Sequence, residues 1–510
     1  MRPFNSRNLF DLSHEKKLTC SMGYLVPIMC EEILPGDKFK VNTDILVRLA
    51  PMLAPIMQNI NVYTHYFFVP NRLLWDKWED FITGGADGSD ASVPPTIEIT
   101  NATTSSLADY LGIPTGITNA LAVSALPFRA YNLVYNEWYR DENLQEPVTI
   151  SLASGADTTT NTTLLRRCWQ RDYFTNALPF QQRGDAVRLP LGNSAPLKTY
   201  NVLETGEVGA RSGNFVVQGG DNVLGLASKS SSSFDPADNF NEATPAYTNF
   251  GGHYWLGADL SDATAATIND IRQAFQVQRW LEKNARAGAR YVETILSHFN
   301  VRSSDARLQR PEYLGGGKSP IMISEVLQSS ADDGQPTPLA TMAGHGISAQ
   351  RSHQFKKFFE EHGFVIGLLS IMPRSGYFQG LSRMWNRSTR YDYYWPVFSH
   401  LGEDAVYNRE LYAQGTDDDA GVFGFQPRYQ DYRRRYGTVH GDFRSSLKFW
   451  HLAREFESLP QLNAEFIECN PDTRIFAVQE GDHFWVELRN NISALRPIPV
   501  HGTPGFIDHD

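Results

Sequence analysis

The longest helical periodicity in the chain runs from Thr267 to Phe299. Apolar side chains recur there three or four residues apart, and charged side chains occupy the opposite face. Thr267, with an acidic residue three positions later, is typical of a helix N-terminus. A proline and three consecutive glycines at 315–317 then exclude further helix, and the apolar run 321–327 indicates a strand. The stretch 267–327 is therefore predicted to form one long helix, a charged loop with a glycine turn, and a strand.

Alternation of apolar and polar positions predicts strands elsewhere. Residues 18–69 have a β pattern, and the period of two is most regular from Phe39 to Leu49. The apolar run from Gly363 to Met372 is typical of a buried strand. Two apolar segments around a Glu-Gly-Asp turn predict a hairpin from Ile475 to Leu488. Strands therefore recur from one end of the chain to the other.

The segments between these elements are rich in Gly, Ser, Thr, Asn and Pro. The longest is 192–262, and structureless loops of that length are uncommon inside a compact domain, so we predict an insertion that leaves the core. Shorter loops of similar composition are predicted at 84–118, 154–163 and 328–350.

Only two further helices are predicted, at 71–81 and 130–140. Many short strands, long loops and few helices indicate a mainly β fold of the sandwich or jelly-roll type. The predicted organisation has three parts. They are an N-terminal arm and the first part of the core with surface loops (1–191), the insertion (192–262), and the helix with the remaining strands, loops and a C-terminal arm (263–510).

Composition supports a folded chain and excludes some partners. Of 510 residues, 41% are hydrophobic and 20% are charged, which is typical of globular proteins. Aromatic residues reach 12%, which fits either large protein–protein interfaces or a large aromatic core. The net charge of −11 excludes nucleic-acid binding by overall charge but leaves a local basic surface open.

The chain carries no predicted export or membrane signal. Its basic N-terminus lacks the apolar core of a signal peptide, and its apolar runs are too short to cross a bilayer. Four cysteines without metal-ligand spacing fit a reducing cytosol. We therefore expect no membrane insertion and no disulfide framework.

The motif search gives little support for an enzyme. Gly315–Ser319 ends like a phosphate-binding loop, but Glu312 stands where the motif needs its first glycine and Pro320 follows at once. The histidines lack HExxH spacing, and Asp417–Asp419 lacks the alternation of a calcium loop. No serine-hydrolase motif stands near a triad. No catalytic residue, cofactor or metal site is predicted.

Two tracts that interleave aromatic and basic side chains carry the main candidate chemistry. Bases stack on aromatic rings and phosphates need cations, so such tracts suit single-stranded nucleic acid; they equally suit contacts between subunits. The candidate residues are Arg383, Trp385, Arg387, Arg390, Tyr429, Tyr432, Arg433, Arg434, Arg435 and Tyr436.

Several segments resemble the major capsid protein of microviruses, which are small icosahedral single-stranded-DNA bacteriophages, and especially of their gokushovirus branch. They occur in one order over nearly the whole chain: FDLS, LPGDKF, YFFVPNRLLWDKW, RAYNLVYNEWYRDENL, RDYFTNALPFQQRG, RWLEKNARAGARYVE, SDARLQRPEYLGGGKSPI and PGFIDH. The resemblance implies one eight-stranded antiparallel jelly roll of the viral capsid type with large insertions. It also implies a T=1 icosahedral shell around circular single-stranded DNA.

The resemblance further implies partners and places. The insertion 192–262 would form a protrusion at the threefold axis and contribute to host attachment through a cell-surface receptor. Pentameric intermediates, a small basic DNA-binding protein and an internal scaffolding protein would take part in assembly in the bacterial cytoplasm, and the product would be the virion. In this context the arginine-rich helix and the loop after it are predicted subunit contacts, through Arg286, Arg290, Arg307 and Arg310.

Two other function classes stay open at this point. A carbohydrate-active enzyme on a jelly roll would use the aromatic residues to line a sugar cleft. A receptor-binding spike alone fits less well, because the insertion is a minor part of the chain. The state of assembly of the purified protein would separate these alternatives.

Overall fold

The structure is a computed structural model. The residues that it describes are 7–86, 89–185, 187, 197–202, 208–211, 253–258, 268–287, 290–302, 304, 309–327 and 342–500. The chain forms two compact units, one of residues 1–183 with 282–510 and the other of residues 184–281.

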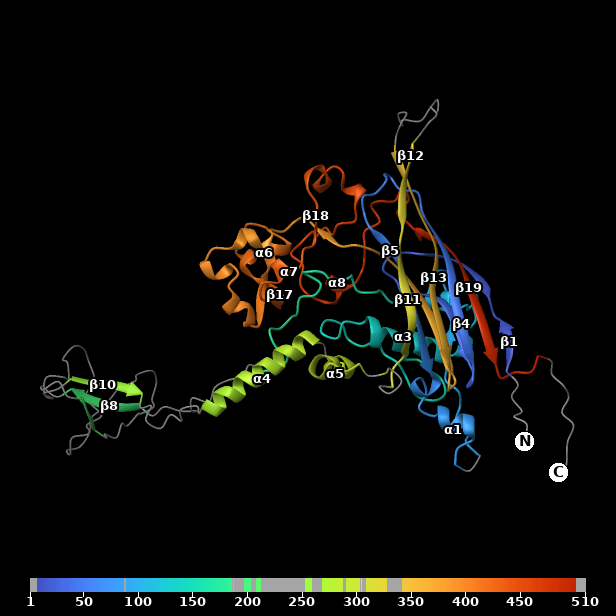
Figure 1. Cartoon of the computed structure of the whole chain (residues 1–510), viewed down its shortest axis with the longest axis horizontal. Helices are drawn as coiled ribbons and strands as arrows, with labels where there is room; N and C mark the ends of the chain where they lie inside the picture. The colour runs from blue at the N-terminus through green and yellow to red at the C-terminus, as the bar shows by residue number, and fades with distance from the viewer. Residues whose placement is uncertain are drawn as a thin grey trace, which may run out of the picture. The chain divides into compact units, whose positions relative to one another are not determined.

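Two facing antiparallel sheets form the body of the first unit (Figure 1). The first sheet has, in order, β1 (Asn8–Asp11), β19 (Phe484–Arg496), β4 (Lys38–Leu49), β13 (Met342–Phe358) and β12 (Met322–Leu327), with β2 (His14–Cys20) also paired to β19. The second sheet has the order β11 (Glu312–Pro320), β5 (Ile60–Pro70), β14 (Gly363–Pro373) and β3 (Val26–Ile33).

The remaining elements are smaller. The helices are α1 (Trp78–Thr83), α2 (Leu107–Tyr110), α3 (Leu126–Val134), α4 (Ile268–Ala287), α5 (Tyr291–Phe299), α6 (Asn408–Leu411), α7 (Gln430–Arg433) and α8 (Ala464–Ile467). The short 3-10 and π segments are η1 (Asn71–Leu73), η2 (Tyr135–Tyr139), η3 (Arg383–Asn386), η4 (Arg390–Asp392), η5 (Pro396–His400), η6 (Asp417–Ala420), η7 (Gly441–Arg444) and η8 (Lys448–Trp450). The minor strands are β6 (Thr96–Ile99) with β7 (Leu121–Ser124), β8 (Leu197–Val202) with β9 (Val208–Arg211) and β10 (His253–Ala258), β15 (Gly376–Tyr377) with β18 (Gly437–Thr438), and β16 (Glu403–Tyr407) with β17 (Val422–Pro427).

The main core lies between the two large sheets. Side chains of β4 alternate between buried and more exposed positions along its length, as the period-two pattern predicts for a strand with one face on a core. Across the core, Tyr66 of β5 packs on Phe355 of β13, with ring centroids 5.4 Å apart. Thr43 of β4 shares a buried hydrogen bond with the Tyr66 hydroxyl and donates one to Asn490 at 2.9 Å. The predicted mainly β, antiparallel fold is therefore confirmed, and it is consistent with a capsid jelly roll.

The strands β5 and β14 of the second sheet are covered on both faces, which explains the continuous apolar sequence of β14. One face of β5 and β14 belongs to the main core, while Phe67 and Ile366 on the other face pack in a second cluster with α3. A strand buried on both sides cannot alternate with polar residues, so it reads as an unbroken apolar run. The strands predicted in 18–69 and the buried strand predicted at 363–372 are confirmed.

Several predicted elements differ in the structure. The predicted single helix is two helices, α4 and α5, because Arg290 has an extended backbone (φ −68°, ψ 142°) and precedes the first turn of α5. The glycines at 315–317 form no turn but lie inside β11, paired with β5. A Cβ on Gly316 would lie 2.5 Å from the Thr64 carbonyl oxygen, so glycine at this position lets β11 and β5 approach each other closely.

The loop prediction at 328–350 is wrong for its second half. Residues 342–350 belong to β13, which pairs with β4 and β12. A Cβ on Gly344 would lie 2.4 Å from the Ala54 carbonyl oxygen, so the glycine there again reflects packing. The first half of the predicted loop lies outside the described residues.

The predicted hairpin at 475–488 has only its second strand. Ile475 and Phe476 are fully buried, and Phe476 makes an isolated bridge to Met52 instead of pairing with β19. These two residues are apolar because they pack in the core and not because they form a strand. The sheets themselves contain six and four strands, so the predicted count of eight is not confirmed. Among the described helices, none has the length and apolar character needed to cross a bilayer.

Candidate nucleic-acid and intersubunit surface

The two aromatic and basic tracts lie against each other in the structure. Residues 381–436 are here called the aromatic lobe. This segment contains β16, β17, α6 and α7 (Figure 1). Arg387 of the first tract forms an ion pair with Asp431 and donates a hydrogen bond to the Tyr432 hydroxyl at 2.5 Å. Its guanidinium also lies 4.4 Å from the Tyr432 ring centroid. The sequence found both tracts, but only the fold joins them.

Arg383 serves the interior of the lobe. Its guanidinium forms ion pairs with Asp404 at 2.7 Å and with Glu410 at 3.3 Å, and it donates to the Ala405 carbonyl at 2.7 Å. The Glu410 carboxylate also accepts from the Tyr173 hydroxyl at 2.9 Å. Burial raises the pKa of Glu410, and the charge of Arg383 opposes that rise. This predicted DNA or subunit contact is therefore already engaged inside its own chain.

Tyr429 is buried and Tyr436 is half-buried. Tyr436 packs on Phe174 and Tyr377, with ring centroids 4.9 and 5.8 Å away, and burial raises its pKa to about 12. Tyr429 is buried, and its hydroxyl donates to the Tyr393 carbonyl at 3.1 Å. Both rings therefore already pack against side chains of their own chain.

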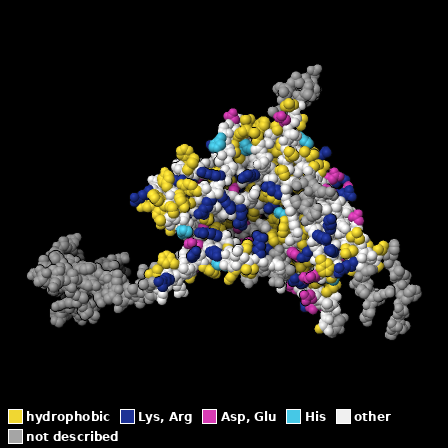
Figure 2. Space-filling model, in the orientation of Figure 1, with side chains coloured by type: hydrophobic (Ala, Val, Ile, Leu, Met, Phe, Trp, Pro, Cys, Tyr) yellow, Lys and Arg dark blue, Asp and Glu magenta, His cyan; other side chains and the backbone are white. Residues whose placement is uncertain are grey.

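The other members of the tracts lie at the surface. Trp385 is 72% exposed, Tyr432 is about half exposed, and Arg390 lies over its neighbour Tyr391. The lobe exposes many further large apolar side chains: Leu381, Met384, Tyr393, Tyr394, Trp395, Val397 and Leu401. Figure 2 shows hydrophobic side chains gathered over this part of the molecule. A large exposed apolar surface of this kind is typical of a protein–protein contact.

Arg433 is the last residue of α7, and Arg434 and Arg435 follow it. All three are exposed. Within the part of the chain that the structure describes, their side chains make no ion pair and no ring contact. Three adjacent cations without a counter-charge repel one another, so an external anion would stabilise them. Figure 2 shows Lys and Arg side chains gathered between the aromatic lobe and the large sheets.

The predicted subunit contacts of the helical segment bind their own chain. Arg286 pairs with Glu403 at the start of β16. Arg290 pairs with Glu142 at 3.1 Å and donates to the Asn136 carbonyl at 2.8 Å. Arg310 lies 4.2 Å from the Trp138 ring centroid, while Arg307 lies outside the described residues. These three side chains and their partners all belong to the first unit, and the contacts hold the segment around α5 within it.

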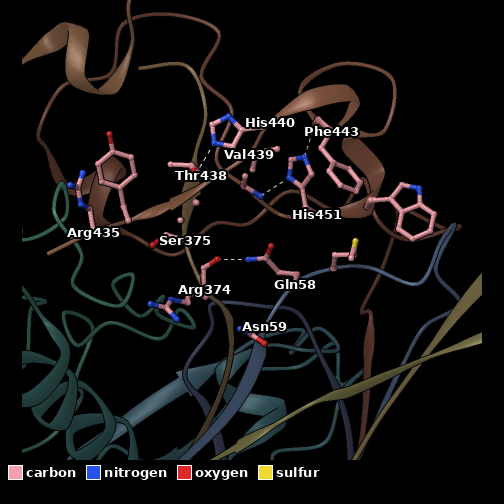
Figure 3. Close-up of a pocket in the computed structure, with 16 residues that line it drawn as sticks. Gln58, Asn59, Arg374, Ser375, Arg435, Thr438, Val439, His440, Phe443 and His451 are labelled. Carbon is pink, nitrogen blue, oxygen red and sulfur yellow. Dashed lines mark hydrogen bonds between the residues drawn. The ribbon is translucent and has the colours of Figure 1, made fainter. Parts of the chain in front are cut away.

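An open groove of about 560 Å³, which no sequence pattern indicated, lies beside the aromatic lobe (Figure 3). It is lined by residues 57–59, 374–376, 435–440, 443, 450, 451 and 453. Arg435 and Tyr436 are the two earlier candidates that line it. Arg374 was missed because it stands alone beside an apolar strand, and only the pairing of β15 with β18 brings it near the second tract.

The described residues show no arrangement for metal chemistry. Nowhere among them do three His, Cys, Asp or Glu side chains gather closely enough to hold an ion. Burial raises the pKa of the Cys20 and Cys469 thiols, which keeps them protonated and poor ligands.

Comparison with known proteins gives one consistent result. A family model described as "Capsid protein (F protein)" matches residues 4–506. Capsid protein VP1 of Bdellovibrio phage phiMH2K is 39% identical, over 98% of this chain and 95% of its own length. Capsid protein VP1 of Chlamydia phage 1 is 38% identical, over 98% and 96%. Capsid protein VP1 of Spiroplasma virus 4 is 31% identical, over 98% and 95%.

Proposed function

The chain belongs to the capsid protein (F protein) family, and on that premise we propose that it assembles into a T=1 icosahedral shell that encloses circular single-stranded DNA. The predicted resemblance to microvirus capsid proteins is thereby confirmed, as is a structural role in a phage virion. A family of structural capsid proteins is not one of enzymes, so the carbohydrate-active alternative is set aside.

The exposed apolar surface of the aromatic lobe carries the proposal that copies of this chain associate. Trp385 and Val397 are 72% and 79% exposed in the isolated chain. Leaving such side chains in water forfeits roughly 1.5–3 kcal/mol for each large apolar side chain that could be buried. Packing against a neighbouring copy would recover this free energy, and closed symmetry requires each copy to present the same surface.

The exposed arginines at the end of α7 support the proposal that the shell contains DNA. Arg433–Arg435 are exposed and lack a counter-charge among the described residues, and the net charge of the chain is −11. A negatively charged subunit can hold a polyanion only through such local basic surface. A small basic DNA-binding protein would supply further neutralisation, and an internal scaffolding protein would assist assembly; both remain proposals, as do pentameric intermediates.

Host attachment is proposed for the insertion 192–262, as a threefold protrusion that contacts a cell-surface receptor. Support comes from its length and composition, since most of it lies outside the described residues. Surface loops tolerate variation and commonly carry recognition.

The decisive experiment is expression of the full chain, with isolation of any particles by sedimentation and imaging by electron microscopy. We expect closed icosahedral particles, with nuclease-resistant circular single-stranded DNA when a replicating genome is present. A monomer or small oligomer under all assembly conditions, without protected DNA in native particles, would overturn the proposal. Alanine at Arg433, Arg434 and Arg435 together should lower the DNA content per particle. Fewer assembled particles with an unchanged DNA content per particle would reassign this tract to a subunit interface.

A further inference from the structure

The groove beside the aromatic lobe contains two arginines that the fold places together. β15 and β18 pair in parallel, with Gly376 opposite Gly437. Arg374 and Arg435 each stand two positions before these paired glycines. This pairing brings the two segments side by side. Both belong to the lining of the groove (Figure 3).

The backbone that carries Arg374 is held firmly while its side chain stays exposed. Its amide donates to the Asn59 carbonyl at 2.9 Å, and its carbonyl accepts from the Gln58 side chain (Figure 3). The neighbouring Ser375 hydroxyl donates to Asp172 at 2.6 Å. The backbone at this position is therefore held in place, and the exposed guanidinium is open to a ligand.

No acidic side chain lines the groove to neutralise these cations. Neither guanidinium forms an ion pair with a residue that the structure describes. Two cations that line the same groove repel each other. A bound anion would remove that repulsion, and guanidinium groups match the geometry of phosphate oxygens.

The rest of the lining adds aromatic surface and a neutral polar group. Phe443 and Trp450 are half-buried, with ring centroids 6.5 Å apart. Burial lowers the pKa of His451, so its ring is neutral at pH 7. Its Nε2–H donates to the Phe443 carbonyl at 2.7 Å, and its Nδ1 accepts from the Ala453 amide at 3.1 Å. The histidine therefore shapes the groove, and the arginines supply its positive charge.

From this combination we propose that the groove binds a segment of single-stranded DNA, with a phosphate at Arg374 and Arg435 and a base against Trp450. The volume of about 560 Å³ lies within the range of about 300–1,000 Å³ that small-molecule sites occupy. Aromatic stacking accepts any base, and the paired cations accept any phosphate, so the site would be independent of sequence. The inference rests on the proposed DNA-enclosing shell and names a place where that DNA would be held.

An acidic peptide is the other occupant that paired arginines could bind. A peptide carboxylate would use the cations but would gain little from Trp450 and Phe443, whereas a nucleotide uses both. The aromatic lining therefore favours DNA, and the experiment includes the peptide as a competing probe.

The test measures binding of a fluorescent thymidine oligonucleotide to the purified full chain at several salt concentrations. We expect Arg374→Gln with Arg435→Gln to reduce the slope of log affinity against log salt by about 0.7, because the two arginines together neutralise one phosphate and each neutralised phosphate on a single strand contributes about 0.7. Trp450→Ala should weaken oligonucleotide binding by about tenfold and leave inorganic polyphosphate binding unchanged. Arg48→Gln, on the outer face of β4, is the matched control and should change neither.

Each other outcome has a defined meaning. Oligonucleotide binding that is unchanged in folded Arg374→Gln/Arg435→Gln protein would overturn the inference. So would loss of poly-glutamate binding without loss of oligonucleotide binding, which would assign the groove to a protein partner. Circular dichroism confirms folding, and the single variant Arg435→Gln replaces the double variant if the latter misfolds. Native particles with protected DNA but unaffected groove variants would leave the proposed shell standing and remove only this site.

Discussion

Arg383→Met should destabilise the aromatic lobe far more than an exposed arginine substitution does. The change removes the cation from Glu410, whose side chain is only 1% exposed, and leaves that carboxylate buried without its partner. Breaking a buried ion pair in this way costs about 3–5 kcal/mol. Arg383 itself is 20% exposed, which lets some water reach the site and places the expected loss near the lower end, about 3 kcal/mol.

The same reasoning predicts a dependence on pH. Because burial raises the pKa of Glu410, the folded chain favours the protonated form, and stability from this group declines as pH rises through the folded pKa. Arg383 opposes that rise, so its removal raises the folded pKa further. The loss of stability in Arg383→Met should therefore be larger at about pH 8 than at about pH 5, which is near the ordinary pKa of glutamate.

Hydrogen exchange of the β16–β17 amides is the suitable measurement, because it reports local opening of the lobe and does not require the whole chain to unfold in one step. Arg390→Met is the matched control, since Arg390 is exposed and contacts only its neighbour Tyr391 among the described side chains. Adding Glu410→Gln to Arg383→Met should recover part of the loss, because no charge then remains buried. A loss below about 1 kcal/mol, or one equal at both pH values, would refute the reasoning, because a solvated pair contributes about that little.

Three further changes test other parts of the fold. Arg129→Met should lower the free energy of unfolding by about 3–5 kcal/mol, since its ion pair is fully buried, while surface Arg48→Met should stay within about 0.5 kcal/mol. Deletion of 192–262 should leave the denaturation midpoint of the remaining chain nearly unchanged, because long surface excursions cost little; a chain that no longer folds would place the segment in the core. Gly316→Ala should cost about 1–3 kcal/mol in urea unfolding through overpacking against β5, and an unaltered midpoint would show that the strands separate freely.

The local sequence pattern was sufficient to predict the strands whose faces are regularly buried. Period-two alternation identified β4, and a continuous apolar run identified β14, because each pattern reports directly which faces of a strand are covered. Glycine-rich segments misled the prediction at 315–317 and 342–350. Glycine signals a turn when it adopts unusual dihedral angles, but here it makes room for a neighbouring strand, and that neighbour is distant in sequence.

For the candidate surface, too, some features could be predicted from the sequence and others could not. Composition found the two aromatic and basic tracts, since stacking and charge are properties of single residues. It could not separate Arg383, which is engaged with Glu410, from Arg433–Arg435, which lack such partners in the described chain. It also passed over Arg374, whose place in the same groove as Arg435 depends on one short parallel pairing.

By itself, the sequence determined the family, the mainly β fold and the residues with the chemistry to bind DNA or a second subunit. The tertiary structure decided which of those side chains are occupied and which are free, and it assembled the groove. The physical reason is that side-chain type and periodicity are local properties. Burial, ion pairing and the convergence of two arginines depend instead on contacts between segments far apart in the chain, which only the folded backbone brings together.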